Sequence, residues 1–381
     1  MTEAILLVGG QGSRLRPLTS HTPKPLLHVA GVPFLAHQLA RAAEAGVGRV
    51  VFATSYLAEL FEPYFGDGER FGLHLEYVTE DQPLGTGGAI RNAARRLRGG
   101  PDEPVLVFNG DILSGLDIAA LRDGHRASGA AVTMHLTRVP DPRAFGLVPT
   151  DADGRVLAFL EKPESPDQLV TDQINAGCYV FTRSAIDRIP DGRVVSVERE
   201  TFPGLLASGE FVRGVVDDTY WLDLGTPAAF VKGSADLVRG VVPSPALPGP
   251  VGEALVLDGA DVHPDAVLGE GTVVGEGAHI AAGAVVNGSV VLPGARIAAG
   301  ARVHRSVIGR HSVVGADCVL DSVVVGDGAT IGAGNELPSG LRIGCGATLA
   351  AEAVRTSAAP IPCTAQSLAS SGVPHASPAA R

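Results

Sequence analysis

The stretch AILLVGGQGSRLR, residues Ala4–Arg16, decides the fold of the first part of the chain. It begins with five apolar residues, Ala4–Val8, a pattern typical of a strand that is buried on both faces. Glycines follow at once, at Gly9, Gly10 and Gly12. A buried strand that runs directly into a glycine-rich loop predicts an α/β sheet with a ligand site at the carboxyl end of that strand.

The following residues continue an alternation of strands and helices. Short apolar runs predict strands at Arg49–Ala53 and Val105–Phe108, and helical patterns fall at Pro33–Ala45 and Gly88–Arg98. This rhythm predicts a doubly wound, mostly parallel sheet of the Rossmann-like kind. The pattern is mixed further along, where we expect two more strands and a last helix: Val156–Leu160, Cys178–Phe181 and Pro227–Val238.

A second architecture begins after a proline-rich segment. Four prolines between residues 243 and 250 predict a stiff linker. Beyond it, apolar residues recur every six positions with three slips of one residue, and glycine often follows them. They are Val262, Leu268, Val274, Ile280, Val286, Leu292, Ile297, Val303, Ile308, Val314, Leu320, Val325, Ile331, Leu337, Ile343 and Leu349. This hexapeptide repeat predicts a left-handed parallel β-helix.

We therefore expect a first domain over residues 1–242, a linker over 243–250 and a β-helix over 251–355. The tail, residues 356–381, is rich in Ala, Ser and Pro, and we expect it to be disordered.

Composition excludes several classes of protein. The formal net charge of −11 argues against a nucleic-acid-binding protein, which needs a basic face. No apolar run approaches the roughly 20 residues of a membrane span, and no secretory signal opens the chain. The four cysteines lie far apart, without metal-ligand spacing, and predict reduced thiols in a cytoplasmic protein: Cys178, Cys318, Cys345 and Cys363.

The loop Gly9–Arg14 predicts a phosphate site. It fits neither the P-loop nor the dinucleotide-binding template, but its glycines let backbone N–H groups approach an anion. Arg14, Arg16 and Lys24 add positive charge to an acidic chain. Of 30 basic residues only three are lysines, and Lys24 and Lys162 both precede a proline. We interpret this as a need for a compact ammonium group, against the alternative of chance.

Five other segments carry candidate site residues, and each also has a purely structural interpretation. The loop Gln82–Gly88 would approach a base or ribose, or Thr86 would cap the next helix. Asp111 and Asp223 each follow a strand and suit Mg²⁺, or cap a turn. Glu161-Lys162-Pro163 and Asn175-Ala176-Gly177 would bind sugar hydroxyls and a phosphate, or form a surface ion pair and a turn.

Taken together, these segments resemble the sugar-1-phosphate nucleotidyltransferases. The order G-G-x-G-S-R-L-x-P-L-T, P-K-P, G-T-x-G-A, N-x-D, F-G, E-K-P, N-A-G and W-x-D-x-G is complete from Gly9 to Gly225. Within that family, Pro83–Ala89, Ser196–Pro203 and the predicted β-helix are similar to the mannose-1-phosphate guanylyltransferases.

The resemblance implies a role for each candidate residue. Arg14, Lys24, Asp111 and Lys162 would be catalytic, with Lys162 on the sugar phosphate, and Asp111 and Asp223 would hold Mg²⁺. The nucleotide would be lined by Gly9, Gly10, Gly12, Gln82, Gly85 and Thr86. The sugar would face Asn109, Gly146, Glu161 and Asn175.

The implied reaction is transfer of a nucleotidyl group from a nucleoside triphosphate, with GTP and mannose 1-phosphate favoured. A paralogue that uses another hexose 1-phosphate or a cyclitol phosphate, and a non-catalytic sugar-nucleotide-binding subunit, remain as alternatives. A third alternative is acetyl transfer by the β-helix, which carries His279, His304 and His311. The open flank of a β-helix favours self-association, so we expect a homo-oligomer.

Overall fold

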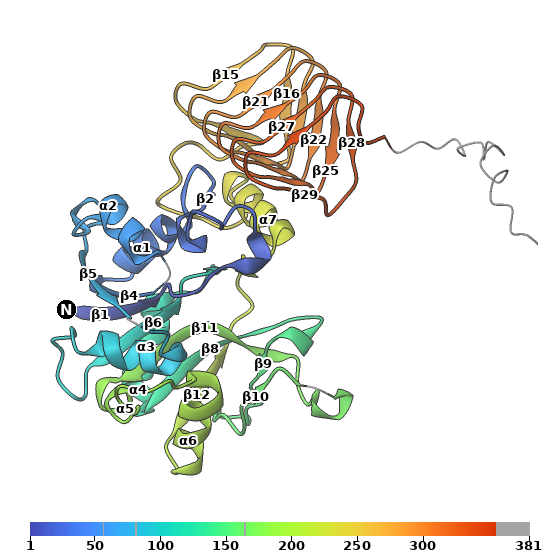
Figure 1. The fold of residues 1–381 in the computed structure, drawn as a ribbon. Helices are drawn as coiled ribbons and strands as arrows, with labels where there is room; N and C mark the ends of the chain where they lie inside the picture. The colour runs from blue at the N-terminus through green and yellow to red at the C-terminus, as the bar shows by residue number, and fades with distance from the viewer. Residues whose placement is uncertain (56, 81, 164, 356–381) are drawn as a thin grey trace, which may run out of the picture.

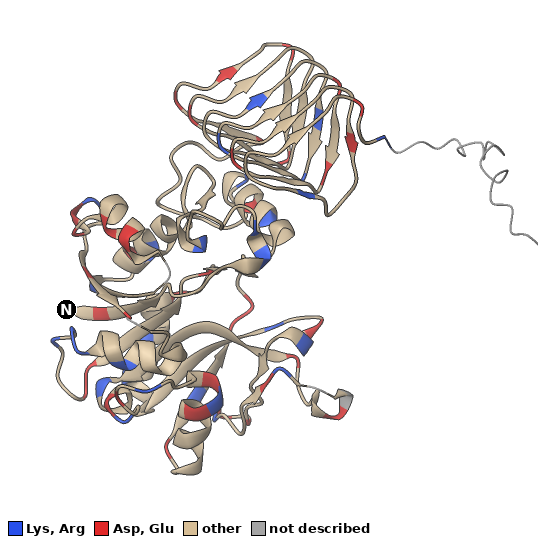
Figure 2. Ribbon diagram, in the orientation of Figure 1, with Lys and Arg blue, Asp and Glu red and all other residues tan. Residues whose placement is uncertain are grey.

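The computed structural model describes residues 1–355 except 56, 81 and 164. The predicted tail over 356–381 lies outside the described residues. An amino-terminal α/β domain and a β-helix are joined through the helix α7 (Pro227–Val238), which lies between them (Figure 1). Charged residues of both signs are spread over the α/β domain, and several strands of the β-helix also carry one (Figure 2).

The α/β domain is built on a nine-stranded sheet with the order β10-β9-β11-β6-β1-β4-β5, extended by β8 and β12. Its strands are β1 (Thr2–Leu7), β4 (Val47–Thr54), β5 (His74–Thr79), β6 (Pro104–Asn109), β8 (Val132–Arg138), β9 (Gly146–Leu147), β10 (Leu160–Glu161), β11 (Gln173–Thr182) and β12 (Val212–Val216). The half from β5 to β6 is parallel, as predicted. The sheet as a whole is mixed, because β11 runs antiparallel to both β6 and β8.

Helices cover both faces of this sheet, which explains the continuous apolar strands. In β1, Ile5 faces one buried cluster, while Ala4 and Leu6 face the other. The helices are α1 (Phe34–Glu44), α2 (Phe61–Phe65), α3 (Gly85–Ala94), α4 (Ile118–Ser128), α5 (Arg183–Asp187) and α6 (Phe202–Ala207). The clusters place α3, α5 and α6 on the Ile5 face and α1, α2 and α4 on the other.

Two local predictions about the α/β domain are corrected. No strand spans Val156–Leu160: Val156 forms only an isolated bridge to Thr150, and the strand β10 begins at Leu160. The helix expected over Gly88–Arg98 begins at Gly85 and ends at Ala94. Its start lies against the backbone of residues 193–195, so closely that a β-carbon on Gly85 would lie 2.6 Å from the Val195 carbonyl oxygen. Close packing therefore explains these glycines.

The second domain is a left-handed parallel β-helix with three sheets. One contains β14 (Ala254–Val256), β17 (Thr272–Val274), β20 (Val290–Val291), β23 (Val307–Ile308), β26 (Val324–Val325) and β29 (Arg342–Ile343). The second contains β15 (Asp261–Val262), β18 (His279–Ile280), β21 (Arg296–Ile297), β24 (Val313–Val314), β27 (Thr330–Ile331) and β30 (Thr348–Leu349). The third contains β16 (Val267–Gly269), β19 (Val285–Asn287), β22 (Arg302–His304), β25 (Val319–Asp321) and β28 (Glu336–Leu337).

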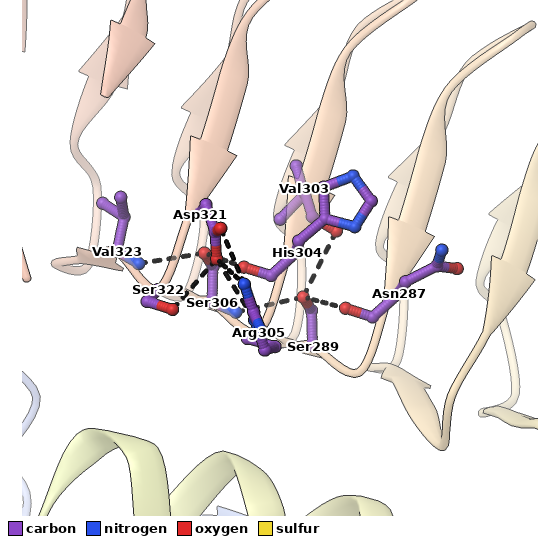
Figure 3. A network of polar contacts seen from close by, with 9 residues as sticks. All are labelled: Asn287, Ser289, Val303, His304, Arg305, Ser306, Asp321, Ser322 and Val323. Atoms are coloured by element: carbon purple, nitrogen blue, oxygen red, sulfur yellow. Dashed lines mark hydrogen bonds and ion pairs between the residues drawn. The ribbon is translucent and has the colours of Figure 1, made fainter. Parts of the chain in front are cut away.

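The three slips in the repeat lie at one corner of the β-helix. The chain passes there from Val286 to Val291, so Val291 and not Leu292 fills the core at the first slip. At the shortened corner, serine hydroxyl groups form hydrogen bonds with backbone groups (Figure 3). The Ser289 hydroxyl donates to the Asn287 carbonyl (2.8 Å) and accepts from the Ser306 backbone N–H (3.1 Å). Ser306 repeats both bonds one coil later.

Candidate active site

The glycine loop leaves β1 and forms one wall of a cavity of about 320 Å³. Gly12 has a φ of 56°, in the left-handed region that favours glycine. A β-carbon there would lie 3.0 Å from the β-carbon of Lys24, so the two arms of the loop touch at this position. The Thr19 hydroxyl donates to the Gly12 carbonyl at 2.9 Å and closes the loop. The loop is therefore a closed, preformed turn with its N–H groups beside the cavity.

Eight of the candidate residues line this one cavity. They are Gly9, Gly10, Gly12, Arg14, Lys24, Thr86, Asn109 and Asp111. The remaining candidates do not line it, although Asp223 contacts two residues that do. Gly110, Gly225 and Ser13 also line the cavity and were not singled out from the sequence.

Two carboxylates and two cations meet at the edge of this cavity. The Lys24 ammonium lies 2.8 Å from Oδ2 of Asp111 and 3.5 Å from Oδ1 of Asp223. The Arg14 guanidinium lies 3.7 Å from Oδ2 of Asp223 and is largely exposed. These four groups come from segments more than 200 residues apart in the sequence, since they run from Arg14 to Asp223.

A short antiparallel ladder sets the two aspartates side by side. β7 (Ile112–Ser114) pairs with β13 (Trp221–Asp223), with Asp223 opposite Ile112. The backbone N–H of Leu224 donates to the Asp111 carbonyl at 3.0 Å. The aspartates thus come from two facing strand ends, which a reading of either segment alone does not reveal.

A glutamine holds the turn that carries Asp111. Nε2 of Gln38, on α1, donates to the carbonyls of both Asn109 and Ile112, at 2.9 Å each. Its Oε1 is buried without a hydrogen-bond partner in the described structure. One turn further along α1, Arg41 donates to the Leu116 carbonyl at 2.7 Å. The sequence alone does not point to Gln38, because a polar residue on a helix gives no signal of what it faces.

The aspartate pair fits a divalent cation. Oδ1 of Asp223 is buried and makes no hydrogen bond in the described structure, although Lys24 lies nearby. Carboxylate oxygens are the ligands that Mg²⁺ prefers, and it is usually held by one or two carboxylates plus substrate phosphates. No cluster of three side-chain ligands forms among the described residues. Two carboxylates beside a glycine-lined cavity match the Mg²⁺ pattern.

The loop before α3 contacts a segment that the sequence analysis did not assign to the site. The Thr86 hydroxyl donates to Oε2 of Glu198 (2.7 Å) and accepts from the Val197 backbone N–H (2.9 Å). Thr86 is therefore not the helix cap, which is Leu84. Gln82 is exposed. Glu198 lies in a single π-helical turn, Val197–Thr201, a feature frequent at functional sites.

The candidate sugar-facing residues form a second group beyond the cavity. β9 and β10 pair Gly146 with Glu161, and a β-carbon on Gly146 would lie 2.7 Å from Oε2 of Glu161. Burial raises the pKa of Glu161, and the charge of Glu198 adds to this. Lys162 has a φ of 50° and an exposed ammonium 3.9 Å from Oε1 of Glu161. A side chain at position 146 would therefore displace the Glu161 carboxylate.

The two candidate asparagines are partly engaged inside the protein. Nδ2 of Asn175 donates to the Tyr179 hydroxyl (2.8 Å), and its Oδ1 accepts from the Gly177 N–H (3.1 Å). Gly177 lies close to Asn109, where a β-carbon would approach Nδ2 to 2.9 Å. These contacts place Asn175 and Asn109 near one another, at the junction of the cavity and the Gly146–Glu161 group.

The β-helix histidines do not share one face. His279 is on the β15–β30 sheet and lies 2.9 Å from Asp261, whereas His304 is on the β16–β28 sheet. His311 lies in a corner with a φ of 53°.

None of the helices in the described part of the chain has the length and apolar character needed to span a membrane.

Comparison with known proteins agrees with both domains. The Nucleotidyl transferase family model matches residues 3–240, and the GMPPB C-terminal domain model matches residues 250–353. The chain is 60% identical over 271 residues to the mannose-1-phosphate guanylyltransferase of Mycobacterium tuberculosis, covering 71% of this chain and 74% of that protein. It is 38% identical over 277 residues to the catalytic subunit beta of this enzyme from Drosophila pseudoobscura pseudoobscura, covering 71% of each.

Among solved structures, HddC from Yersinia pseudotuberculosis, complexed with GMP-PN, is similar with a TM-score of 0.53 and 26% identity. The similarity covers 61% of this chain and 98% of HddC. Two matched domain models and a relative at 60% identity show the family of both parts of the chain. The chain belongs to the sugar-1-phosphate nucleotidyltransferase family.

Proposed function

We propose that this chain transfers the GMP group of GTP to mannose 1-phosphate, giving GDP-mannose and pyrophosphate. The observation that carries the proposal is the meeting of Arg14, Lys24, Asp111 and Asp223 at a glycine-lined cavity. The choice of base and sugar is supported by the identity to the mannose-1-phosphate guanylyltransferases.

The nucleotide would lie along the glycine loop. Backbone N–H groups of Gly9, Gly10 and Gly12 would face its phosphates, because glycine allows the main chain to come close to an anion. Arg14 and Lys24 would neutralise the triphosphate and the departing pyrophosphate. Gln82, Gly85 and Thr86 would lie along the base and ribose.

The sugar phosphate would enter from the side of the second group. The Lys162 ammonium can meet this phosphate, because it is mostly exposed and the nearest carboxylate among the described residues, Glu161, is 3.9 Å away. Glu161, Gly146, Asn109 and Asn175 would face the sugar hydroxyls.

The reaction is an in-line displacement at phosphorus. A phosphate oxygen of mannose 1-phosphate forms a bond to the α-phosphorus of GTP, the α–β bridging P–O bond breaks, and pyrophosphate leaves with that electron pair. The second pKa of a phosphomonoester is about 6, so the nucleophile is ionised at neutral pH and no general base is required. The side chains act by positioning and by neutralising charge.

We propose Mg²⁺ as the cofactor, held by Asp111 and Asp223. Bound there, it would neutralise charge on the phosphates. Lys24, which lies between the two carboxylates, would then turn its ammonium toward the phosphates.

We also propose a cytoplasmic homo-oligomer. Cys178, Cys318 and Cys345 are unpaired thiols, as expected in a reducing compartment. The outer side of the β16–β28 sheet exposes Val267 and Val319, by 55% and 39%, which favours association through the β-helix.

The test is pyrophosphate release from each of the four nucleoside triphosphates, paired with mannose 1-phosphate, other hexose 1-phosphates and a cyclitol phosphate. The proposal predicts the highest kcat/KM for GTP with mannose 1-phosphate. Faster turnover of another sugar phosphate would identify a paralogue with a changed substrate. Binding of GDP-mannose without pyrophosphate release from any pair would identify a non-catalytic subunit.

A further inference from the structure

One face of the β-helix is buried against the α/β domain. On the outer side of the β14–β29 sheet, successive coils place Val273, Val290, Val307 and Val324 in register. All four are buried in a cluster that also holds Phe230, Val231 and Leu237 of α7. The doubled apolar residues of these strands, such as Val273-Val274, are the sequence sign of a sheet covered on both sides.

Residues next to the phosphate loop are buried in the same cluster. Leu15 and Leu18, on the carboxyl-terminal side of the glycines, are buried there. Leu224, which follows Asp223, is buried in the same cluster. The apolar side of the loop therefore packs in a core that the β-helix completes.

The ladder of valines ends in an arginine. In the last coil, Arg342 takes the register position next to Val324. Nη1 of Arg342 donates to the Arg16 carbonyl at 3.0 Å, and Sγ of Cys345 lies 3.7 Å from the Pro17 carbonyl. Among the described residues, no carboxylate lies within ion-pair distance of Arg342. Its recorded polar contact is with the main chain of the loop.

This contact lies two residues from Arg14. The short helix Ser13–Leu15 is capped at its carboxyl end by Arg16, whose backbone N–H donates to the Ser13 carbonyl. Fixing the Arg16 carbonyl therefore fixes the end of the turn from which Arg14 projects toward Asp223. Around Arg342 the interface is open: a cavity of about 560 Å³ separates α7 from the coils. The hydrogen bond bridges the two domains where apolar packing does not.

We propose that the β-helix is part of the catalytic unit and that Arg342 is a positioning residue, which acts on the nucleotide through the loop that carries Arg14. This inference rests on the proposed use of the loop for nucleotide phosphates, and it gives the β-helix a role beyond assembly.

The experiment measures binding of GTP by calorimetry, and steady-state kinetics, on the full-length chain. Arg342→Ala should weaken GTP binding and raise the KM for GTP by about three- to tenfold, the effect of losing one hydrogen bond. The KM for mannose 1-phosphate should stay within about twofold of the wild-type value, because the lost hydrogen bond to the Arg16 carbonyl is remote from the proposed sugar site. Arg342→Lys, which can still donate to the carbonyl, should recover most of the GTP affinity. Arg302→Ala is the matched control, because Arg302 is exposed on the outer side of β22 and its side chain has no hydrogen-bond or ion-pair partner within the described part of the chain.

A double-mutant cycle with Arg14→Ala separates positioning from stability. If Arg342 acts through Arg14, then Arg342→Ala should cause little further loss of GTP affinity in the Arg14→Ala protein. Equal losses in both backgrounds, or unchanged GTP affinity in folded Arg342→Ala, would overturn the inference. If the wild type prefers another nucleotide or sugar, the proposed function fails, but the same cycle with the preferred nucleotide still decides the role of Arg342.

Discussion

The Lys24 ammonium lies 2.8 Å from Oδ2 of Asp111 and also within 3.5 Å of Oδ1 of Asp223, so one cation is shared by two carboxylates. Its side chain is 11% exposed. In the protein without substrate, Lys24 balances the charges that are proposed to hold Mg²⁺. The same ammonium is within reach of the cavity that the glycine loop lines.

Replacing Lys24 should therefore affect the chemical step as well as binding. We expect Lys24→Ala to lower kcat by about 10²- to 10³-fold, the usual cost of removing one group that stabilises developing charge. Lys24→Arg should be nearly as damaging, because the planar guanidinium does not fit between the two carboxylates. Lys232→Ala is the control: Lys232 is on α7, paired with Asp236, and should leave kcat unchanged. Equal kcat values for Lys24→Ala and Lys232→Ala would contradict the assignment.

Lys162 should act on the other substrate. We expect Lys162→Ala to raise the KM for mannose 1-phosphate by about tenfold or more, the loss of one charged hydrogen bond, with the KM for GTP little changed. Because Lys162 has a φ of 50°, Lys162→Gly removes the ammonium without leaving a β-carbon in the left-handed region. Initial rates with each substrate varied should give the same KM for both variants. A KM for mannose 1-phosphate that stays at the wild-type value in Lys162→Ala would contradict this role.

Gln38 is expected to govern the metal through the turn that carries Asp111. Gln38→Met removes both donors to the carbonyls of Asn109 and Ile112 at similar volume. We expect the Mg²⁺ concentration for half-maximal activity to rise by about tenfold, as for other residues that orient metal ligands. Electron paramagnetic resonance of Mn²⁺ should show the same loss of affinity without turnover. Arg41→Met, one turn along α1, is the control and should leave metal affinity unchanged. Identical Mn²⁺ affinity in Gln38→Met and wild type would refute this role.

Much of this arrangement follows from the sequence, and the rest depends on long-range packing. The strand at Ala4–Val8, the helix Pro227–Val238 and the β-helix repeat are local patterns, and the structure has all three. The position of Glu198 beside Thr86 does not follow from a local pattern. It depends on a π-helical turn and on the packing of residues 193–195 against α3.

The same limit explains the misplaced elements. Val156–Leu160 is apolar, but Leu157 is 59% exposed, and composition alone does not show that this segment lacks a strand partner along its length. The hexapeptide pattern predicts Leu292 in the core of the β-helix, where the structure has Val291. Both residues are apolar and both are buried, on opposite sides of the sheet, so the pattern does not distinguish them.

Acid should destabilise the fold through a buried histidine. His37 lies between the Val29 carbonyl and the Ser244 hydroxyl, and burial lowers its pKa from 6.5 to about 4. Between those values the unfolded chain binds a proton that the folded chain does not. The free energy of unfolding should therefore decrease as the pH is lowered, by up to about 1.4 kcal/mol per pH unit for this residue. Above the unfolded value the contribution is constant.

Urea unfolding of the wild type and His37→Gln at about pH 7 and about pH 5 measures this effect. The variant should lose less stability over that range than the wild type. His28, His125 and His135 have similarly lowered pKa values and remain in both proteins, so the difference isolates His37. An equal or greater loss in the variant would contradict the prediction.

The most direct test of the central claim follows the α-phosphorus itself. GTP labelled at the α-phosphorus is incubated with mannose 1-phosphate, Mg²⁺ and either wild type or Asp111→Ala, and the products are separated. The wild type should place the label in GDP-mannose, with release of unlabelled pyrophosphate, and Asp111→Ala should leave it in GTP. Label that stays in GTP or is released as GMP with the wild type, or normal labelling of GDP-mannose by Asp111→Ala, would contradict the account.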